Sequence, residues 1–419
     1  MKKKILILGG TNFSCEIVHA AHKLNMEVYV TDYYADSPAK SIADNSFMVS
    51  ATDVDRVVRL IKDYAIDGVI FGYADVLMPS YVDICTKAGL PCYTTHELNR
   101  LTLDKRYFKN KCQEYDIPIV PEYNYDDALE GNISYPVLVK PIDNSGARGI
   151  YICKDKKDLI EAYEQSLSYS RNKKVLIERY STAPEATAFY FVHEGKVKLL
   201  GFADRHMLRY DEKNLPLPIG YTFPSAKYET LKDELQNKIP KMFQQEGARE
   251  GFIFVQGFIE EDSFVPYEMG YRFTASLEQH LFEKIYGFNH MAEILKFAVG
   301  YSVDNKSIEL IDASKGHYAN VTLLLNKGTI VKYIGLEEIS NHPNVIHTFV
   351  SYPIGTEISD QQYGKLSQVG IRVLLYAENM NELMNIMDYI KDTICVLDEV
   401  GHNMLIKNYS YNCKNRSFE

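Results

Sequence analysis

A lysine at the end of an apolar run, followed by a glycine-containing segment, is the first place in the sequence that indicates chemistry. Lys140 ends this run, and a buried lysine costs free energy unless it meets an anion. The segment 143–150 follows at once and contains Ser145, Gly146 and Gly149. Small residues let the backbone approach a ligand closely, and free amides can hold phosphate oxygens. Taken alone, the segment fits a surface hairpin equally well.

A second group of polar residues lies on a predicted hairpin at 251–272. Two apolar strands flank a turn around Asp262, and folding them together places Gln256 opposite Glu268. Because side chains alternate along a strand, Glu268 and Arg272 should share a face. Two oxygen ligands and a guanidinium directed into one space suit Mg²⁺ that bridges phosphates.

The N-terminal part of the chain predicts a scaffold in which strands and helices alternate. Strand patterns occur at 4–8, 27–31, 68–71 and 91–94, and helical patterns at 16–24, 53–64 and 76–88. Such repetition with short links predicts a parallel sheet covered by helices. The next helix should begin near Thr94, which has capping-box spacing to Glu97, and another helix should span 104–115.

The middle of the chain has a different pattern, in which strands dominate from Val137 to Arg272. Helices are expected there at 156–169 and 227–246, and a helix at 288–299 should close this α+β block. The remaining segment is mixed. It predicts strands at 318–325, 328–334 and 369–377 and an amphipathic helix at 381–394.

Composition excludes several classes of protein. The chain has 46 basic and 56 acidic residues, so its net charge of −10 gives no general attraction to nucleic acid or to an anionic membrane. No apolar stretch is long enough for a membrane span, and the N-terminal apolar run is too short for a signal peptide. The seven cysteines include no Cys-x-x-Cys pair. We therefore expect neither disulfides nor a zinc site, and a cytoplasmic location.

Taken in their order along the chain, the lysine, glycine, glutamate and arginine motifs described above resemble those of the ATP-grasp superfamily. This superfamily includes carbamoyl-phosphate synthetase, biotin carboxylase and L-amino-acid ligases. The resemblance covers nearly the whole chain. It implies a pre-ATP-grasp α/β domain with a parallel sheet at 1–103 and an α+β ATP-grasp domain at 104–304, with a mobile lid at about 120–184. A C-terminal α/β subdomain would follow at 305–419.

The resemblance also implies a role for each matching residue. Lysines would reach the ATP phosphates, the glycine-rich loop would cover them, a hinge would contact adenine, and an acid would bind ribose. The ATP-binding residues would be Lys105, Lys140, Ser145, Gly146, Gly149, Glu178, Arg179, Tyr180 and Glu185. The metal ligands would be Gln256 and Glu268, and the catalytic residues Arg272 and Lys140. The implied cofactors are ATP and Mg²⁺, with Mn²⁺ as an alternative ion.

Two positions depart from the family pattern. Gln256 stands where the family usually has an acid, and Gly270 stands where it usually has an asparagine. One carboxylate and one side-chain oxygen are lost, so metal binding should be weaker unless an acid such as Glu261 or Glu278 compensates. These departures bear on activity more than on the fold.

Three further residues are candidates for substrate contact. Arg205 and His206 end a hairpin strand where family members often place basic residues, and His280 could touch the acceptor substrate. A solvated strand end and a half-exposed helix histidine are the alternatives. Near the N-terminus, the glycines after the first strand fit a tight strand-to-helix turn, or contact with a small substrate. Asp32 stands where a ribose-binding acid would, but the Gly-x-Gly-x-x-Gly fingerprint of a dinucleotide site is missing.

We therefore expect an ATP-dependent carboxylate–amine ligase, or a related one. ATP would phosphorylate a substrate carboxylate, and an amine would attack the acyl phosphate, releasing ADP and phosphate. The implied partners are a small-molecule carboxylate and an amine, with no nucleic acid and no membrane, and a homodimer is left open. The alternative is an ATP-binding protein with lost or minimal catalysis. An NAD-dependent oxidoreductase is a weaker third reading.

Overall fold

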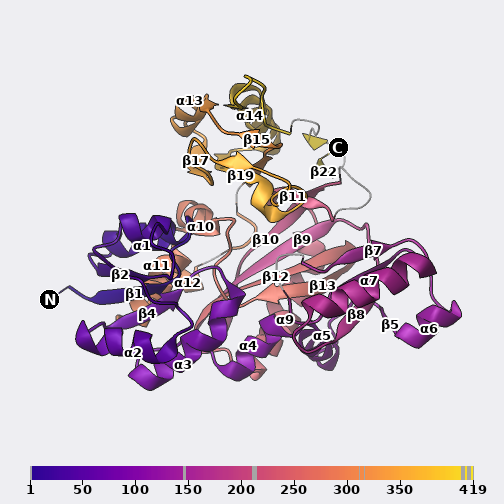
Figure 1. The fold of residues 1–419 in the computed structure, drawn as a ribbon, viewed down its shortest axis with the longest axis horizontal. Helices are drawn as coiled ribbons and strands as arrows, with labels where there is room; N and C mark the ends of the chain where they lie inside the picture. Colours follow the sequence, from indigo (N-terminus) through magenta and orange to yellow (C-terminus); the bar gives the residue numbers. More distant parts are fainter. Residues whose placement is uncertain are drawn as a thin grey trace.

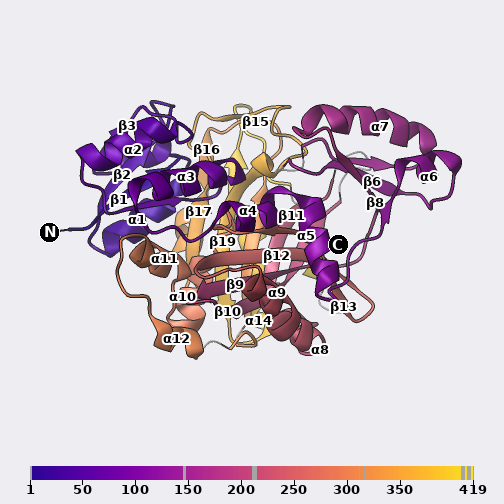
Figure 2. The same ribbon diagram turned by 90° about the horizontal axis from the view of Figure 1, so that it is seen from below.

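The computed structural model describes residues 2–144, 148–209, 215–310, 312–315, 317–406, 411–412 and 417–418. Figure 1 shows an N-terminal unit on one side, a lid that projects on the other, and a C-terminal part above a long central sheet. In the view from below, the lid again lies at the end of the molecule away from the N-terminal unit (Figure 2). Among the described residues, no helix combines the length and the apolar character that a membrane crossing requires.

The N-terminal unit is the parallel sheet that strand–helix alternation predicts. Its strand order is β3-β2-β1-β4, and every pair is parallel. The strands are β1 (Lys4–Leu8), β2 (Glu27–Thr31), β3 (Asn45–Phe47) and β4 (Gly68–Phe71). The helices are α1 (Ser14–Lys23), α2 (Val54–Asp63) and α3 (Met78–Ala88), with single 3-10 turns η1 (Pro38–Ser41) and η2 (Asp75–Leu77). The sequence pattern did not indicate β3, which is short and largely polar.

Two local predictions in this unit are wrong. The segment 91–94 forms no strand, because the Tyr93 amide donates to the Tyr81 hydroxyl (3.3 Å) and the buried Tyr93 ring packs on Tyr81. Thr95, not Thr94, caps the helix that follows, α4 (His96–Leu103), by accepting from the Leu98 amide at 3.1 Å. Tertiary contacts of buried side chains override the local pattern here.

The lid is a small antiparallel sheet with its own apolar core, and helix α5 (Lys105–Glu114) leads into it. Its strand order is β5-β8-β6-β7, and all pairs are antiparallel. The strands are β5 (Glu122–Tyr123), β6 (Val137–Pro141), β7 (Tyr151–Cys153) and β8 (Val175–Arg179). Helices α6 (Tyr125–Glu130) and α7 (Lys156–Tyr169) contribute to the core, in which Val137, Val139, Leu159 and Ile177 are buried.

The central sheet has eight strands in the order β13-β12-β9-β10-β11-β14-β19-β17. They are β9 (Glu185–His193), β10 (Lys196–Leu208), β11 (Leu217–Phe223), β12 (Gly251–Glu260), β13 (Ser263–Gly270), β14 (His317–Leu324), β17 (Val345–Val350) and β19 (Val369–Ala377). The associated helices are α8 (Tyr228–Asp233), a π-helical turn η3 (Glu234–Lys238), α9 (Ile239–Gln245), α10 (Glu278–Tyr286), α11 (His290–Ala298) and α12 (Asn305–Glu309).

The C-terminal part continues this sheet rather than building a separate one. Strand β14 pairs antiparallel with β11 of the preceding block, and β19 and β17 extend the sheet from there. Helices α13 (Leu336–Ser340) and α14 (Met380–Thr393) accompany these strands, with a 3-10 turn η4 (Leu366–Gln368). Two-stranded pairs complete it: β15 (Gly328–Thr329) with β18 (Glu357–Ile358), β16 (Lys332–Ile334) with β20 (Cys395–Leu397), and β21 (Tyr411–Asn412) with β22 (Ser417–Phe418). The single strand predicted at 328–334 is therefore two strands with different partners.

Candidate active site

The hairpin formed by β12 and β13 has the predicted pairing at its polar end. Gln256 lies directly opposite Glu268, and a register shift between Gln256 and Gly257 displaces the pairs nearer the turn by one residue. The Glu268 side chain is 39% exposed, so its carboxylate faces open space rather than the core. The two predicted metal-binding side chains are therefore brought together by one antiparallel ladder.

The glycine at position 270 has a structural reason. Gly270 pairs with Phe254 across the hairpin, and a Cβ atom at position 270 would lie 2.3 Å from the Phe254 ring. The same ring lies under the Arg272 guanidinium, at 5.2 Å from its centroid. The Phe254 ring thus fills the space that any side chain at position 270 would need. The same ring stabilises the Arg272 guanidinium by a cation–π contact.

Arg272 is held by an acid that the sequence reasoning missed. Its Nε and NH2 groups both donate to the Asp75 carboxylate, the latter at 3.3 Å, and its NH1 donates to the Phe273 carbonyl at 2.8 Å. Burial alone would lower the pKa of Arg272, but Asp75, with smaller contributions from Glu268 and Tyr93, outweighs burial and the pKa is raised. Asp75 lies in η2, just after β4, and polar residues at the carboxyl ends of parallel strands are a known signal for binding sites.

A buried cluster of two lysines and one glutamate joins α5, β6 and β8. Glu178 Oε2 lies 2.5 Å from Lys140 Nζ, and Glu178 Oε1 lies 2.7 Å from Lys109 Nζ. All three residues are almost fully buried. Burial alone would raise the pKa of Glu178, but the two ammonium groups hold it below its usual range. The sequence pattern indicated Lys140 and Glu178 but not Lys109. A lysine within a helix is usually exposed, so its sequence position gave no sign that Lys109 is buried.

Lys105 connects the lid to the hairpin. Its Nζ donates to the Asn144 carbonyl at 2.6 Å and lies 3.8 Å from the Glu268 carboxylate. Lys105 is buried at the start of α5, which Asp104 caps by accepting from two backbone amides. Two predicted site residues from distant parts of the sequence, Lys105 and Glu268, therefore meet in the structure.

The predicted loop over the phosphates is described only in part. Ser145 and Gly146 lie outside the described residues. Gly149 has a φ of +77°, and a Cβ atom there would lie 2.7 Å from the Tyr169 Cβ. Only glycine meets both constraints without strain, so packing against α7 already explains this residue.

The predicted adenine hinge already uses its backbone amides within the protein. The Arg179 amide donates to the Pro121 carbonyl (3.0 Å), and the Tyr180 amide donates to the Pro136 carbonyl (3.2 Å). The Arg179 side chain pairs with Glu260. While these bonds persist, a nucleotide base at this hinge would have to contact carbonyl oxygens or the residues that follow.

Glu185 and Arg205 were predicted separately, as a ribose ligand and a substrate contact, but they form one ion pair. The Tyr267 hydroxyl donates to the Glu185 carboxylate at 2.7 Å and lies 2.9 Å from an Arg205 nitrogen. Arg205 also donates to the Tyr221 hydroxyl at 3.2 Å. Both contacts that Glu185 makes here use its Oε2 oxygen. A ribose contact would therefore fall to its other oxygen.

His206 and His280 have different surroundings from those expected. His206 is buried against the Thr222 hydroxyl (2.8 Å), and burial lowers its pKa to about 3. It is therefore neutral near pH 7 and offers no positive charge to a phosphate. His280 contacts Glu16 and His347, in a cluster apart from the lysine–glutamate group.

No sequence pattern indicated a group of buried polar side chains on α10 and β19. Burial raises the pKa of Glu278, and among the described residues its Oε1 atom, the Gln279 side-chain amide nitrogen and the Arg372 Nε atom have no hydrogen-bond partner. Arg372 NH1 donates to the Thr322 hydroxyl at 2.8 Å. Unpaired buried polar atoms are rare in native proteins and often mark a place where a ligand binds. Arg372, on β19, gave no sequence signal because its strand is otherwise apolar.

We expect the substitution Gln256→Glu to tighten binding of Mg²⁺. The new carboxylate would lie across the hairpin from Glu268 and add a formal charge where a hard cation prefers carboxylate oxygen. ATP affinity measured by calorimetry at increasing Mg²⁺ concentration checks this. Weaker ATP binding at saturating Mg²⁺ would instead show that the Gln256 amide donates to a phosphate oxygen.

Comparison with known proteins shows which domain the middle of the chain resembles. Residues 104–306 match the family model "Carbamoyl-phosphate synthase L chain, ATP binding domain". A formate-dependent phosphoribosylglycinamide formyltransferase from Prochlorococcus marinus is 26% identical over 186 residues, which are 42% of this chain and 47% of the relative. The chain thus spans about half the length of the curated relatives it matches.

Two solved structures share the fold over almost the whole chain. The biotin carboxylase domain of 2-oxoglutarate carboxylase from Hydrogenobacter thermophilus, solved as a dimer with MgADP and bicarbonate, superposes with a TM-score of 0.77 at 19% identity, covering 94% of this chain and 91% of that one. L-amino acid ligase from Bacillus licheniformis gives 0.76 at 17% identity, covering 95% and 99%. The chain therefore has the fold of these ATP-grasp proteins over nearly its whole length, and its residues 104–306 match the ATP-binding domain of the carbamoyl-phosphate synthase L chain.

Proposed function

We propose that this chain is an ATP-dependent ligase that joins a carboxylate to an amine through an acyl phosphate and releases ADP and phosphate. One observation carries the proposal. Lys105 Nζ lies 3.8 Å from the Glu268 carboxylate, and Glu268 is close enough to raise the pKa of Arg272. A lysine, an arginine and a half-exposed carboxylate thus converge between the lid and the hairpin, where they suit the terminal phosphates of ATP.

The donor set at the hairpin fits a hard divalent cation. Glu268 offers a half-exposed carboxylate, and Gln256 offers an amide oxygen directly across the ladder. These two residues would hold Mg²⁺, or Mn²⁺ in its place, and the ion would neutralise charge on the ATP phosphates. MgADP in the 2-oxoglutarate carboxylase domain supports this cofactor.

The residues of the site would act by positioning and by neutralising charge. Lys105 and Lys140 would hold the β- and γ-phosphates while a carboxylate oxygen of the substrate attacks the γ-phosphorus and the bond to the β-phosphate oxygen breaks. Arg272, fixed by Asp75, would stabilise the charge on the transferred group. The amine would then attack the acyl carbon, and phosphate would leave with the C–O bonding electrons. Closing the lid would keep water from the acyl phosphate.

Buried polar groups support a second substrate beside the phosphates. Glu278 and Arg372 each carry an unpaired atom, and Glu278 lies on the segment that follows Arg272. A substrate with carboxylate or amine groups would satisfy such atoms, whereas an empty apolar pocket would not need them. The identity of the two substrates is left to the experiment.

We expect turnover to yield ADP and inorganic phosphate rather than AMP and pyrophosphate. The positive charges of Lys105, Lys140 and Arg272 would lie on the terminal phosphates, whereas an adenylating enzyme would place them at the α-phosphate. Phosphorus NMR of reactions with Mg-ATP and pooled amino acids and carboxylates provides the measurement. A Glu268→Gln variant serves as the control with reduced turnover. Pyrophosphate as product would refute the acyl-phosphate route.

An ATP-binding protein without catalysis is the second candidate, and Gln256 in place of an acid favours it. The same reactions decide between the two functions. ATP that binds with ordinary affinity but is not consumed with any pool would support the second candidate. We further propose a cytoplasmic enzyme that forms a homodimer, as the 2-oxoglutarate carboxylase domain does.

A further inference from the structure

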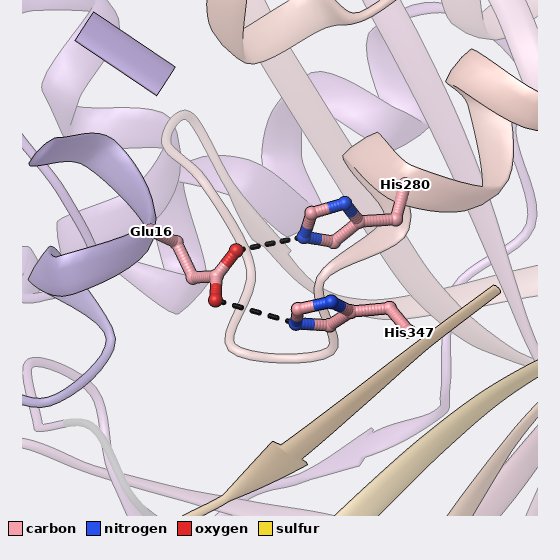
Figure 3. Close-up of side chains that lie close together, drawn as sticks. All are labelled: Glu16, His280 and His347. Carbon is pink, nitrogen blue, oxygen red and sulfur yellow. Dashed lines mark hydrogen bonds and ion pairs between the residues drawn. The ribbon is translucent and has the colours of Figure 1, made fainter. Parts of the chain in front are cut away.

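Three side chains from distant parts of the chain meet at one point outside the proposed ATP site. Glu16 lies on α1, His280 on α10 and His347 on β17 (Figure 3). The Nε2 atom of His280 lies 2.7 Å from one Glu16 oxygen, and the Nε2 atom of His347 lies 3.3 Å from the other. The N-terminal unit, the ATP-grasp domain and the C-terminal part each contribute one residue.

The donor atoms are spaced as ligands of a single ion are. All three lie within 4.8 Å of one another. Two ligands that share a tetrahedral ion at bond lengths of about 2.0–2.1 Å are roughly 3.3 Å apart, so the observed spacing needs little adjustment. The two imidazole rings stack with centroids 3.9 Å apart and an interplanar angle of 19°, which directs both Nε2 atoms toward the same carboxylate (Figure 3).

The surroundings leave this cluster short of protein partners. The His347 Nε2 atom is buried and makes no hydrogen bond within the described part of the chain, although it lies 3.3 Å from a Glu16 oxygen. A carboxylate placed between two imidazoles presents a donor set of two nitrogens and an oxygen.

An ion could reach the cluster from solvent. Glu16 and His280 line a surface pocket together with His19, Gln279 and Glu283, whereas His347 is not part of its lining. An ion from solvent could thus approach two of the three residues, and a water molecule would supply the fourth ligand, as in metal sites with three protein ligands.

We propose that Glu16, His280 and His347 bind a divalent transition-metal ion such as Zn²⁺, which ties the three parts of the chain together. Imidazole nitrogen favours such ions over Mg²⁺, so this site differs in kind from the all-oxygen site at Glu268. The proposal stands on this geometry alone and does not depend on the ligase function.

Cobalt provides the test, because Co²⁺ occupies zinc sites and its visible absorption bands report nitrogen coordination. The full-length protein is stripped of metal with a chelator and titrated with Co²⁺. We expect one equivalent to bind with visible bands that Zn²⁺ abolishes and millimolar Mg²⁺ does not. His280→Gln and His347→Gln should each weaken Co²⁺ binding by more than about 100-fold, since even outer-shell changes cost 10- to 100-fold.

Two control variants locate the ion. His402→Gln removes a histidine that is 82% exposed, and Glu268→Gln removes the predicted Mg²⁺ ligand. Both should keep the cobalt bands. If the histidine variants fold poorly, proton NMR of the Co²⁺-loaded wild-type protein decides, because two coordinated histidines should each give a paramagnetically shifted, exchangeable ring N–H signal. Absence of these signals, or bands that persist in both cluster variants, would overturn the proposal.

Discussion

The substitution Lys140→Ala should weaken ATP binding by between about 10- and 150-fold. Lys140 would donate to phosphate while it keeps its contact with Glu178, since an ammonium group has three donors. A hydrogen bond to a charged group contributes about 1.5–3 kcal/mol, which corresponds to that range of affinity. Isothermal calorimetry with Mg-ATP measures the change.

Lys109→Ala is the matched control for this experiment. Lys109 is as deeply buried as Lys140 and contacts the same Glu178 carboxylate, but its other contacts are the Val120 carbonyl (2.9 Å) and the Glu122 carboxylate (3.7 Å). Both variants leave Glu178 with one lysine, so both should have a lower free energy of unfolding in urea. The loss should be at most the roughly 3–5 kcal/mol that a broken buried ion pair costs. Only Lys140→Ala should lose ATP affinity beyond what unfolding explains. Equal ATP affinity in the two variants would contradict the assignment of Lys140 to the phosphates.

Arg272→Lys should slow turnover by about 100- to 1000-fold and change ATP affinity much less. The substitution keeps the charge but removes the planar fork that donates to Asp75 and Phe273 at the same time. Removing one donor that stabilises a transition state typically costs this much in kcat. Steady-state kinetics with an active substrate pair, beside calorimetry of ATP binding, separates the two effects.

Asp75→Asn tests how the arginine is positioned. The amide still accepts one hydrogen bond but no longer neutralises the guanidinium, so kcat should fall less than in Arg272→Lys, and ATP affinity should hold. Lys227→Ala, which removes an exposed ion pair with Asp262, should change neither quantity. Equal losses of kcat and ATP affinity in Arg272→Lys would show that the arginine contributes uniform binding rather than transition-state stabilisation.

The sequence by itself determined most of the helices and strands of this protein, and missed β3 and the division of 328–334 into two strands. The pairing of Gln256 with Glu268 was predicted from strand periodicity and a turn around Asp262, and the structure reaches it through a register shift between Gln256 and Gly257 that the sequence did not indicate. Lys140 could be singled out because a lysine at the end of a buried strand needs an anion, whatever the rest of the fold. The family resemblance then supplied an order of motifs, and residues 104–306 match an ATP-binding domain model of that kind.

Only the tertiary structure decided which distant side chains meet. Asp75 holds Arg272, Lys109 shares Glu178 with Lys140, and Glu16 joins His280 and His347, yet no local pattern links these residues. The Phe254 ring that explains Gly270 likewise depends on the exact pairing across the hairpin. Side-chain periodicity describes one element at a time, whereas ion pairs and packing contacts depend on how whole elements are placed by burial of apolar surface. Such contacts therefore became visible only once the chain was folded.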